Sequence, residues 1–305
     1  MTQANTNGAE STIQGKIVCG IAGFYYVSVS QQGIYECKAK GIFRRDGKKP
    51  LCGDNVAISI LSETDKTGNI MEIDSRSNEL IRPAIANIDQ ALLVFSIQSP
   101  VPNFNLLDRF LLMMMQKNIP CILCFSKQDL VTQKETDRVY EIYKDARVPI
   151  LFLSNQAGDQ IEKLKDLLRG KTTTIAGPSG VGKSTLINRL QTAVRMETGT
   201  ISKKIERGKQ TTRHTQLIEI EQDTFIADTP GFSSLNLFLC DKEDVKTYYP
   251  EFYTYEGTCR FHGCMHMQEP ECTVKEAVKN GLISQIRYNN YRRIYQECCD
   301  RQTYR

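Results

Sequence analysis

A glycine-rich stretch past the middle of the 305-residue chain has the residue types and spacing of a phosphate-binding loop. The stretch GPSGVGKST fits the pattern of Gly, four residues, Gly, Lys and then Ser or Thr. In such loops backbone N–H groups cradle the phosphates, the lysine reaches the outer phosphates and the next hydroxyl ligates magnesium. The residues we expect to bind a nucleotide here are Gly177, Ser179, Gly180, Val181, Gly182, Lys183, Ser184 and Thr185.

Two further motifs complete a nucleotide site on either side of this loop. In DTPGF, Asp228 follows the apolar run TFIA, where a carboxylate can hold magnesium through water, and Gly231 can offer its N–H to the terminal phosphate. In SKQDL, Asp129 can accept hydrogen bonds from guanine N1 and the exocyclic amine, while the stem of Lys127 lies along the base. The order is base reader, phosphate loop, magnesium carboxylate, which is a circular permutation of the usual GTPase order.

A cluster of soft ligands lies near the C-terminal end of the sequence. The segment CRFHGCMHMQEPEC contains Cys259, Cys264, His266 and Cys272, with His262 as an alternative imidazole. Four such ligands on short loops suit a closed, structural tetrahedral zinc site. The chain has eleven cysteines and no secretory signal, which favours a reducing compartment and metal binding over disulfides.

The elements that must position these residues follow from hydrophobic patterning. Residues 12 to about 80 contain short β-rich runs separated by turn residues, which predicts a small β barrel or sandwich. From about residue 84 the apolar runs ALLVFS, CILCFS, ILFLS, TTTIA and TFIAD alternate with helical stretches, which is typical of a mostly parallel α/β sheet. After DTPGFSSLNL the pattern becomes helical and rich in cysteine.

Composition and charge exclude several other classes. The chain is 40% hydrophobic and 24% charged, as in ordinary globular proteins, and its net charge of +4 says little about partners. It has no run of 18 apolar residues and no apolar signal-peptide core, so we expect a cytoplasmic protein without a membrane span.

Taken together, these features resemble the ribosome small-subunit-dependent GTPase A family over nearly the whole chain. The permuted motif order, the zinc cluster and the β-rich start carry the resemblance, as do NIDQALLVFSIQSP, LLDRFL, YYPEF, CTVKEAV and RYNNYRRI. The resemblance implies an OB-fold at the N-terminus, a central permuted GTPase domain and a C-terminal zinc domain. It also implies GTP hydrolysis stimulated by the small ribosomal subunit during late maturation.

The resemblance also assigns base-side residues by motif. Ser126, Lys127 and Asp129 would form the base-reading element, with a further base contact around Ser154 and Asn155. The chain departs from the family's usual text at two of these positions. The family usually has Asn where Ser126 stands and Ala where Asn155 stands.

Switch I, in the same comparison, falls on RGKQTTRHTQL. There Thr212 would complete the magnesium shell, with Thr211 as the alternative. Many GTPases orient the attacking water with a Gln after the DTPG motif, but this chain has Phe232 there, as the family does. The family uses a His just before the switch I threonines, and that position is Gln210, with His214 as a possible substitute.

Two basic segments are candidates for contact with RNA. The first lies in the β-rich region and contains Lys38, Lys40, Arg44, Arg45, Lys48 and Lys49 beside the aromatic residues Tyr35 and Phe43. The second, RYNNYRRIYQ, offers Arg287, Arg292, Arg293 and three tyrosines that could equally pack on the zinc module.

The predicted architecture is multidomain. It consists of an OB-fold β-barrel with a flexible N-terminal tail over residues 1–80, a circularly permuted α/β P-loop GTPase domain over 81–238 and a mainly α zinc-binding domain over 239–305. The predicted function is GTP hydrolysis in late maturation of the small (30S) subunit, by a monomer that binds GTP or GDP, Mg²⁺, one structural Zn²⁺ and rRNA. The alternatives are a nucleotide-gated RNA-binding module with little hydrolysis and, less favoured, an ATP-using P-loop enzyme.

Overall fold

The computed structural model describes residues 11–41, 43, 49–81, 83–154, 159–191, 215–228 and 241–303. The chain forms two compact units. The first contains Met1–Ile88, Leu168–Thr174 and Gln191–Gly231, and the second contains Asp89–Leu167, Ile175–Leu190 and Phe232–Arg305.

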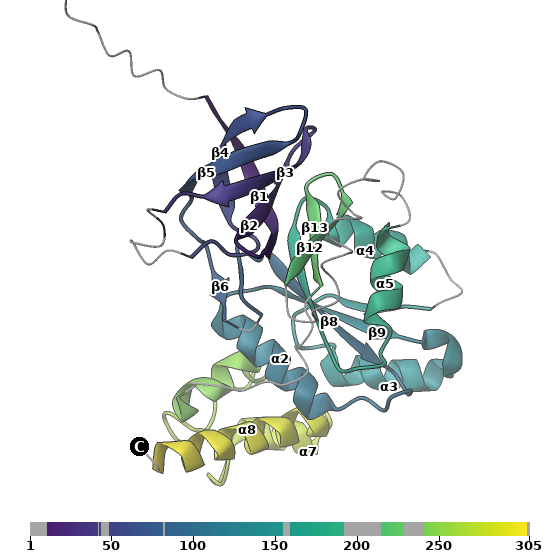
Figure 1. The fold of residues 1–305 in the computed structure, drawn as a ribbon. Coiled ribbons are helices and arrows are strands. Elements are labelled where there is room, and N and C mark those ends of the chain that lie inside the picture. The colour runs from purple at the N-terminus through teal and green to yellow at the C-terminus, as the bar shows by residue number, and fades with distance from the viewer. Residues whose placement is uncertain are drawn as a thin grey trace, which may run out of the picture. The chain divides into compact units, whose positions relative to one another are not determined.

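The first unit contains a closed five-stranded barrel (Figure 1). Its strands are β1 (Thr12–Ile21), β2 (Phe24–Val29), β3 (Gly33–Ala39), β4 (Asn55–Ser62) and β5 (Thr67–Ile73). β1 pairs with both β2 and β4, β3 pairs with β2 and β5, and β4 pairs with β5, so no edge is left open. This closure confirms the predicted N-terminal β-barrel.

The barrel closes because alternate side chains fill its interior and because β1 approaches β2 closely. Val27, Tyr35, Cys37 and Ile58 are among the side chains buried in this core. A Cβ atom on Gly15 would lie 2.5 Å from Val27 Cγ1 and 2.8 Å from the Ser28 carbonyl oxygen. Only glycine therefore fits at this crossing of the two strands.

Other strands pair with one another outside the barrel. β12 (Gln216–Glu221) and β13 (Thr224–Asp228) form an antiparallel hairpin, and Gln216 of β12 pairs with Cys19 of β1. β11 (Thr172–Ala176) runs parallel to β13, and β6 (Glu79–Leu80) pairs with β7 (Ile85–Ala86). Every residue of β11 is buried.

The second unit is built on three parallel strands, β8 (Gln90–Ser96), β9 (Cys121–Ser126) and β10 (Ile150–Phe152). Each of the first two strands leads toward a helical segment: α2 (Phe104–Gln116) after β8, and the short η1 (Gln128–Leu130) with α3 (Gln133–Tyr143) after β9. Asn103 caps α2 and a Thr132–Glu135 capping box starts α3. The helix α4 (Asp159–Leu168) follows β10, so the predicted alternation of buried strands and helices is confirmed.

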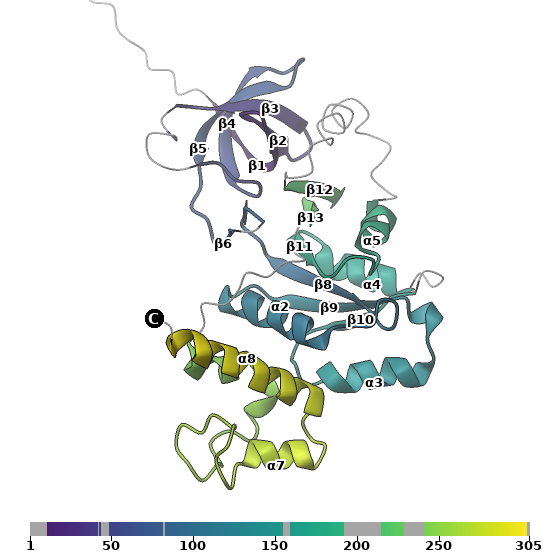
Figure 2. The same ribbon diagram turned by 60° about the horizontal axis from the view of Figure 1, so that its bottom comes forward.

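The C-terminal part of the second unit is mainly helical. It contains two 3₁₀ segments, η4 (Lys242–Tyr248) and η5 (Pro250–Phe252), and two α-helices, α7 (Thr273–Lys279) and α8 (Gln285–Thr303). α8 lies beside α2 in both ribbon views (Figures 1 and 2). None of the helices within the described residues has the length and apolar character needed to cross a bilayer.

A buried charge cluster joins α8 to α2 and η5. The Arg287 side chain is 2% exposed, and its guanidinium donates to Asp108 Oδ1 at 2.5 Å and to Glu251 Oε1 at 2.7 Å. Asp108 also accepts from Asn290 Nδ2 at 2.7 Å and from the Tyr143 hydroxyl at 3.0 Å. Burial raises the pKa of Asp108, and the nearby Arg287 charge offsets part of that rise.

The interpretation of Arg287 as a residue facing RNA is therefore wrong. Its guanidinium carbon lies 4.5 Å from the centroid of the Tyr249 ring, inside the core of the unit. Tyr288 and Tyr291 are buried in the same helix, which supports the packing alternative for these tyrosines. Arg292 and Arg293 stay exposed on α8.

We predict that Arg287→Leu lowers the free energy of unfolding by about 3–5 kcal/mol, because it leaves two buried carboxylates without their cation. Urea unfolding followed by circular dichroism measures the change. Arg292→Leu on the exposed face of the same helix is the matched control, and we expect it to cost less than about 1 kcal/mol. Equal effects of the two substitutions would contradict the role given to the cluster.

Candidate nucleotide and metal sites

The predicted phosphate loop lies between a strand and a helix, as its chemistry requires. β11 ends at Ala176, and α5 (Lys183–Leu190) begins at the loop lysine. Lys183 Nζ folds back over the loop and donates to the carbonyl oxygens of Gly177 at 2.8 Å and Pro178 at 2.6 Å. The side chains of Ser179, Ser184 and Thr185 are exposed at this site, while Val181 is buried beneath the loop.

Gly177 fixes the path of the loop. Its φ is +145°, and a Cβ atom there would lie 2.0 Å from the Val94 carbonyl oxygen of β8. A side chain at this position would push the loop away from β8. Gly180 and Gly182 also have positive φ values, +79° and +94°, in the turn that leads to α5.

The base-reading segment touches this loop directly. Ser126, the last residue of β9, donates its hydroxyl to the Val181 carbonyl oxygen at 2.6 Å, with the Phe95 carbonyl oxygen farther away at 3.3 Å. Lys127 follows with a left-handed φ of +63°, and its ammonium donates to the Gly180 carbonyl oxygen at 3.0 Å and to that of Ser99. Residues more than fifty positions apart in the sequence thus form one continuous surface.

Two other residues predicted to contact the base, Asp129 and Ser154, belong to neighbouring segments. Asp129 is half-buried in η1, two residues beyond Lys127. The carbonyl oxygen of Ser154 accepts a hydrogen bond from Arg189 Nη1 at 2.9 Å, so α5 holds the segment that follows β10. Arg189 was missed in the sequence because an arginine in the second turn of a helix carries no motif.

A small pocket of about 90 Å³ lies between the phosphate loop and the base-reading segment. Ser126, Lys127, Gly182 and Thr185 are among its lining residues, together with Arg189. The structure therefore brings the base-side residues and the loop together.

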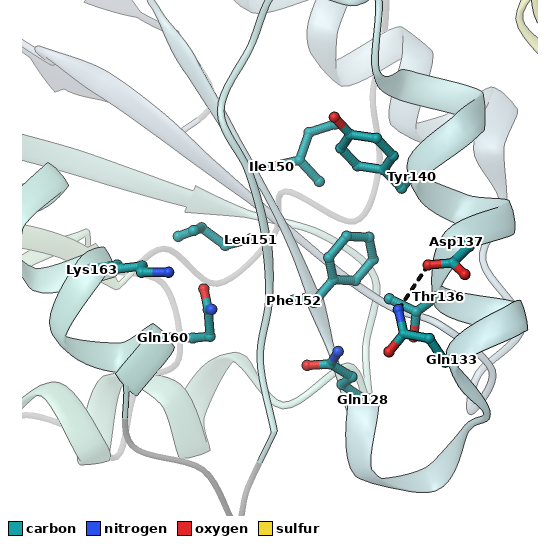
Figure 3. A pocket seen from close by; sticks show the side chains of 10 residues that line it. All are labelled: Gln128, Gln133, Thr136, Asp137, Tyr140, Ile150, Leu151, Phe152, Gln160 and Lys163. Atoms are coloured by element: carbon teal, nitrogen blue, oxygen red, sulfur yellow. Dashed lines mark hydrogen bonds between the residues drawn. The ribbon is translucent and has the colours of Figure 1, made fainter.

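A larger, more open pocket of about 390 Å³ lies over β10 between α3 and α4 (Figure 3). Its polar lining includes Gln133, hydrogen-bonded to Asp137 at 2.7 Å, and Lys163 on the opposite side. It contains none of the residues predicted to bind the nucleotide.

Several predicted residues cannot be placed. Gln210, Thr212 and Gly231 lie outside the described residues, as do Asn155, Thr211 and His214. Asp228 ends β13 and pairs with Gln216 through the backbone, and its side chain lies outside the description. Their roles stay predictions.

The four predicted metal ligands form one compact cluster. Their ligand atoms all lie within 4.8 Å of one another. His266 Nδ1 lies 3.4 Å from Cys272 Sγ and 3.8 Å from Cys259 Sγ, and the two sulfurs are 3.9 Å apart. Ligands around tetrahedral zinc with bonds of about 2.3 Å are about 3.8 Å apart, so this donor set fits the ion. His262 is exposed and outside the cluster.

The electrostatics of the cluster also fit a cation. Burial raises the pKa of Cys264 to about 12 and raises that of Cys272, so thiolates there need a positive partner. Burial also raises the pKa of Cys259, but hydrogen bonds from Thr273 and the start of α7 outweigh it and lower the pKa overall. Burial lowers the pKa of His266, which favours the neutral imidazole that binds metal.

Hydrogen bonds from α8 and to the carboxylate of Glu269 hold the loop that carries the ligands. The Tyr288 hydroxyl donates to the His266 carbonyl oxygen at 2.6 Å, and that of Tyr291 donates to the Met265 carbonyl oxygen. Glu269 accepts from the backbone N–H groups of Met265 at 2.8 Å and Met267 at 2.7 Å. The tyrosines of α8 therefore position the cluster.

The barrel's basic surface differs from the one predicted. Tyr35 and Phe43, the aromatic residues of the candidate RNA-binding segment, are both buried in the barrel core, so the interpretation that they contact RNA is wrong. Of the predicted basic residues, Lys38 lies over a different ring: its Nζ is 5.3 Å from the centroid of Phe24, its pairing partner across β2 and β3. Lys40 and Lys49 are exposed, and Arg44, Arg45 and Lys48 lie outside the described residues.

The barrel, the strand–loop–helix phosphate cradle and the upstream base segment define a circularly permuted P-loop GTPase with an added Cys/His module. The RsgA GTPase family model matches residues 73–238, and the RsgA N-terminal domain model matches residues 14–70. The chain belongs to the RsgA GTPase family.

Relatives similar to this chain cover nearly all of it. A protein of Agathobacter rectalis named small ribosomal subunit biogenesis GTPase RsgA is 52% identical over 300 residues, covering 95% of this chain and 99% of the relative. One of the same name from Alkaliphilus metalliredigens is 46% identical and covers 91% of this chain and 95% of the relative.

Two solved structures have the same fold. YloQ, described as a circularly permuted GTPase, superposes with a TM-score of 0.77 at 36% identity, covering 98% of this chain and 99% of the other. YjeQ from Thermotoga maritima superposes with a TM-score of 0.78 at 33% identity, covering 95% and 99%.

We predict that Cys272→Ser lowers the zinc content of the purified protein from about one ion per chain to well below half. Loss of one thiolate opens the closed site, and thermal unfolding should also begin at a lower temperature. Elemental analysis after dialysis measures the metal. Cys299→Ser, on α8 outside the cluster, should retain the ion, and a zinc-free wild type would contradict the assignment.

Proposed function

We propose that this protein hydrolyses GTP during the biogenesis of the small ribosomal subunit. The observation that carries the proposal is the direct contact of Ser126 and Lys127 with the carbonyl oxygens of Val181 and Gly180. A base-reading motif that precedes the phosphate loop in sequence therefore adjoins it in space. The names of the relatives and the family support the same activity.

The phosphate side of the site is assigned by the loop. Backbone N–H groups of Gly177 and of residues 179–185 would bind the phosphates, with the N-terminal dipole of α5 and the Lys183 ammonium adding positive potential. Mg²⁺ would be held by Ser184 and Thr212, and by Asp228 through water, and would neutralise charge that develops on the phosphates.

The base side is assigned by position after β9 and β10. Asp129 would accept from guanine N1 and the exocyclic amine, and the Lys127 stem would lie along the base. Ser154 and Asn155 would supply a further contact, with Arg189 holding Ser154 in place.

Hydrolysis requires a residue that orients the attacking water. We assign this role to Gln210, with His214 as the alternative, and assign the contact to the terminal phosphate to the Gly231 N–H. GTP and Mg²⁺ would order the switch segments around Thr212 and Gly231, and hydrolysis would relax them.

Contact with the ribosome would use the exposed basic face of the barrel and the zinc module. Lys38 over Phe24, with Lys40 and Lys49, combines phosphate-binding charge with an aromatic plane. We propose rRNA of the small subunit as the partner, a monomeric protein and a cytoplasmic location. We also propose domain boundaries at residues 80/81 and 238/239. The protein would act late in maturation of the subunit, and rRNA would stimulate its turnover.

We predict slow GTP hydrolysis by the protein alone and a many-fold rise on addition of purified small subunits, with no such rise for ATP. Released phosphate under steady-state conditions measures the rate. Tight GTP binding without stimulated turnover would instead support a nucleotide-gated RNA-binding module, and equal use of ATP would support a P-loop ATPase.

The same assay separates the two candidate water-orienting residues. Gln210→Ala should lower the stimulated turnover rate by at least about tenfold, because a side chain that positions the reacting water contributes one or more orders of magnitude to the rate. His214→Ala is the matched comparison. The reverse pattern would move the role to His214, and no effect from either would remove both.

A further inference from the structure

Ser126 occupies the first position of the base-reading motif, but its hydrogen bonding is directed elsewhere. A serine hydroxyl has one proton to donate. In this structure that proton is directed to the Val181 carbonyl oxygen at 2.6 Å, with only the Phe95 carbonyl oxygen as a second acceptor at 3.3 Å. Both are main-chain oxygens of neighbouring elements.

Guanine offers acceptors on its N7 side. Its N7 and O6 atoms both accept hydrogen bonds, so a residue that reads either atom must donate a proton to it. Ser126 can donate to either only by giving up its bond to Val181, the shortest it makes. An asparagine amide has two N–H donors, so it could bond a loop carbonyl and N7 together, whereas serine must choose.

The bond to Val181 has a consequence for the phosphate cradle. In a trans peptide the C=O and the following N–H point in opposite directions. Holding the Val181 carbonyl at Ser126 therefore turns the Gly182 N–H away from β9. Lys127 holds the Gly180 carbonyl in the same way, so two successive peptide groups of the loop are oriented from the base-reading segment.

Resting on the proposed binding of guanine nucleotides at this site, we propose that Ser126 is a positioning residue for the phosphate loop and leaves guanine N7 unread. Guanine selectivity then depends on the edge of the base that Asp129 faces. Ser126 acts on the nucleotide through the Val181–Gly182 peptide.

The test compares GDP, 7-deaza-GDP and ADP binding to the full-length wild-type protein by calorimetric titration. We expect GDP and 7-deaza-GDP to bind within twofold of each other and both to bind far more tightly than ADP. A 7-deaza-GDP affinity five-fold or more below that of GDP would overturn the inference while leaving guanine binding intact. Equal binding of GDP and ADP would overturn the proposed function on which it rests.

Variants at the same position test the positioning role separately. Ser126→Ala should weaken GDP and 7-deaza-GDP binding by the same factor, about fivefold. Ser126→Thr keeps the hydroxyl and should bind both nucleotides as tightly as the wild type does. Ser126→Asn should create a preference for GDP over 7-deaza-GDP of about five- to tenfold. A larger loss for GDP than for 7-deaza-GDP in Ser126→Ala would show that the serine reads N7 and would contradict the proposal.

Discussion

Two hydrogen bonds between the end of β9 and the phosphate loop are the contacts on which the nucleotide site depends. Ser126 and Lys127 donate to the carbonyl oxygens of Val181 and Gly180, and Gly177 allows the loop to pass against the Val94 carbonyl of β8. These contacts join a base-side segment and a phosphate-side segment whose sequence order is reversed relative to ordinary GTPases. Circular permutation is tolerated because the site needs the spatial arrangement of its strands, and the order in which the chain visits them is free.

A second constraint holds the C-terminal helices within the same compact unit. Arg287 is fully buried between Asp108 of α2 and Glu251 of η5, and the tyrosines that follow it on α8 bond the backbone of the Cys/His loop. α2 begins shortly after Ser99, whose carbonyl accepts from Lys127. Lys127 thus bonds the segment before α2, α2 bonds α8, and α8 bonds the loop of the metal ligands, all within one unit.

The sequence was sufficient to predict features that depend on neighbouring residues, and insufficient to predict those that depend on residues far away in the chain. The phosphate loop, its flanking strand and helix, the parallel strands and the four clustered ligands follow from short motifs and periodicity. The burial of Arg287 does not, because its two carboxylates lie 36 and 179 residues away. Tyr35 could have been assigned to the core, since Cys37 two residues later shares its face of the strand. The partner of the Ser126 hydroxyl is 55 residues away and could only come from the fold.

The central claim is that the base reader of this site is Asp129, upstream of the phosphate loop. Binding of GDP and xanthosine diphosphate to wild-type protein and Asp129→Asn tests it most directly, because the substitution exchanges an acceptor for a donor opposite the position where guanine carries an amine and xanthine an oxygen. The account predicts that the variant loses at least about 100-fold in GDP affinity and binds xanthosine diphosphate more tightly than wild type does. Unchanged GDP affinity in Asp129→Asn would contradict the permuted site.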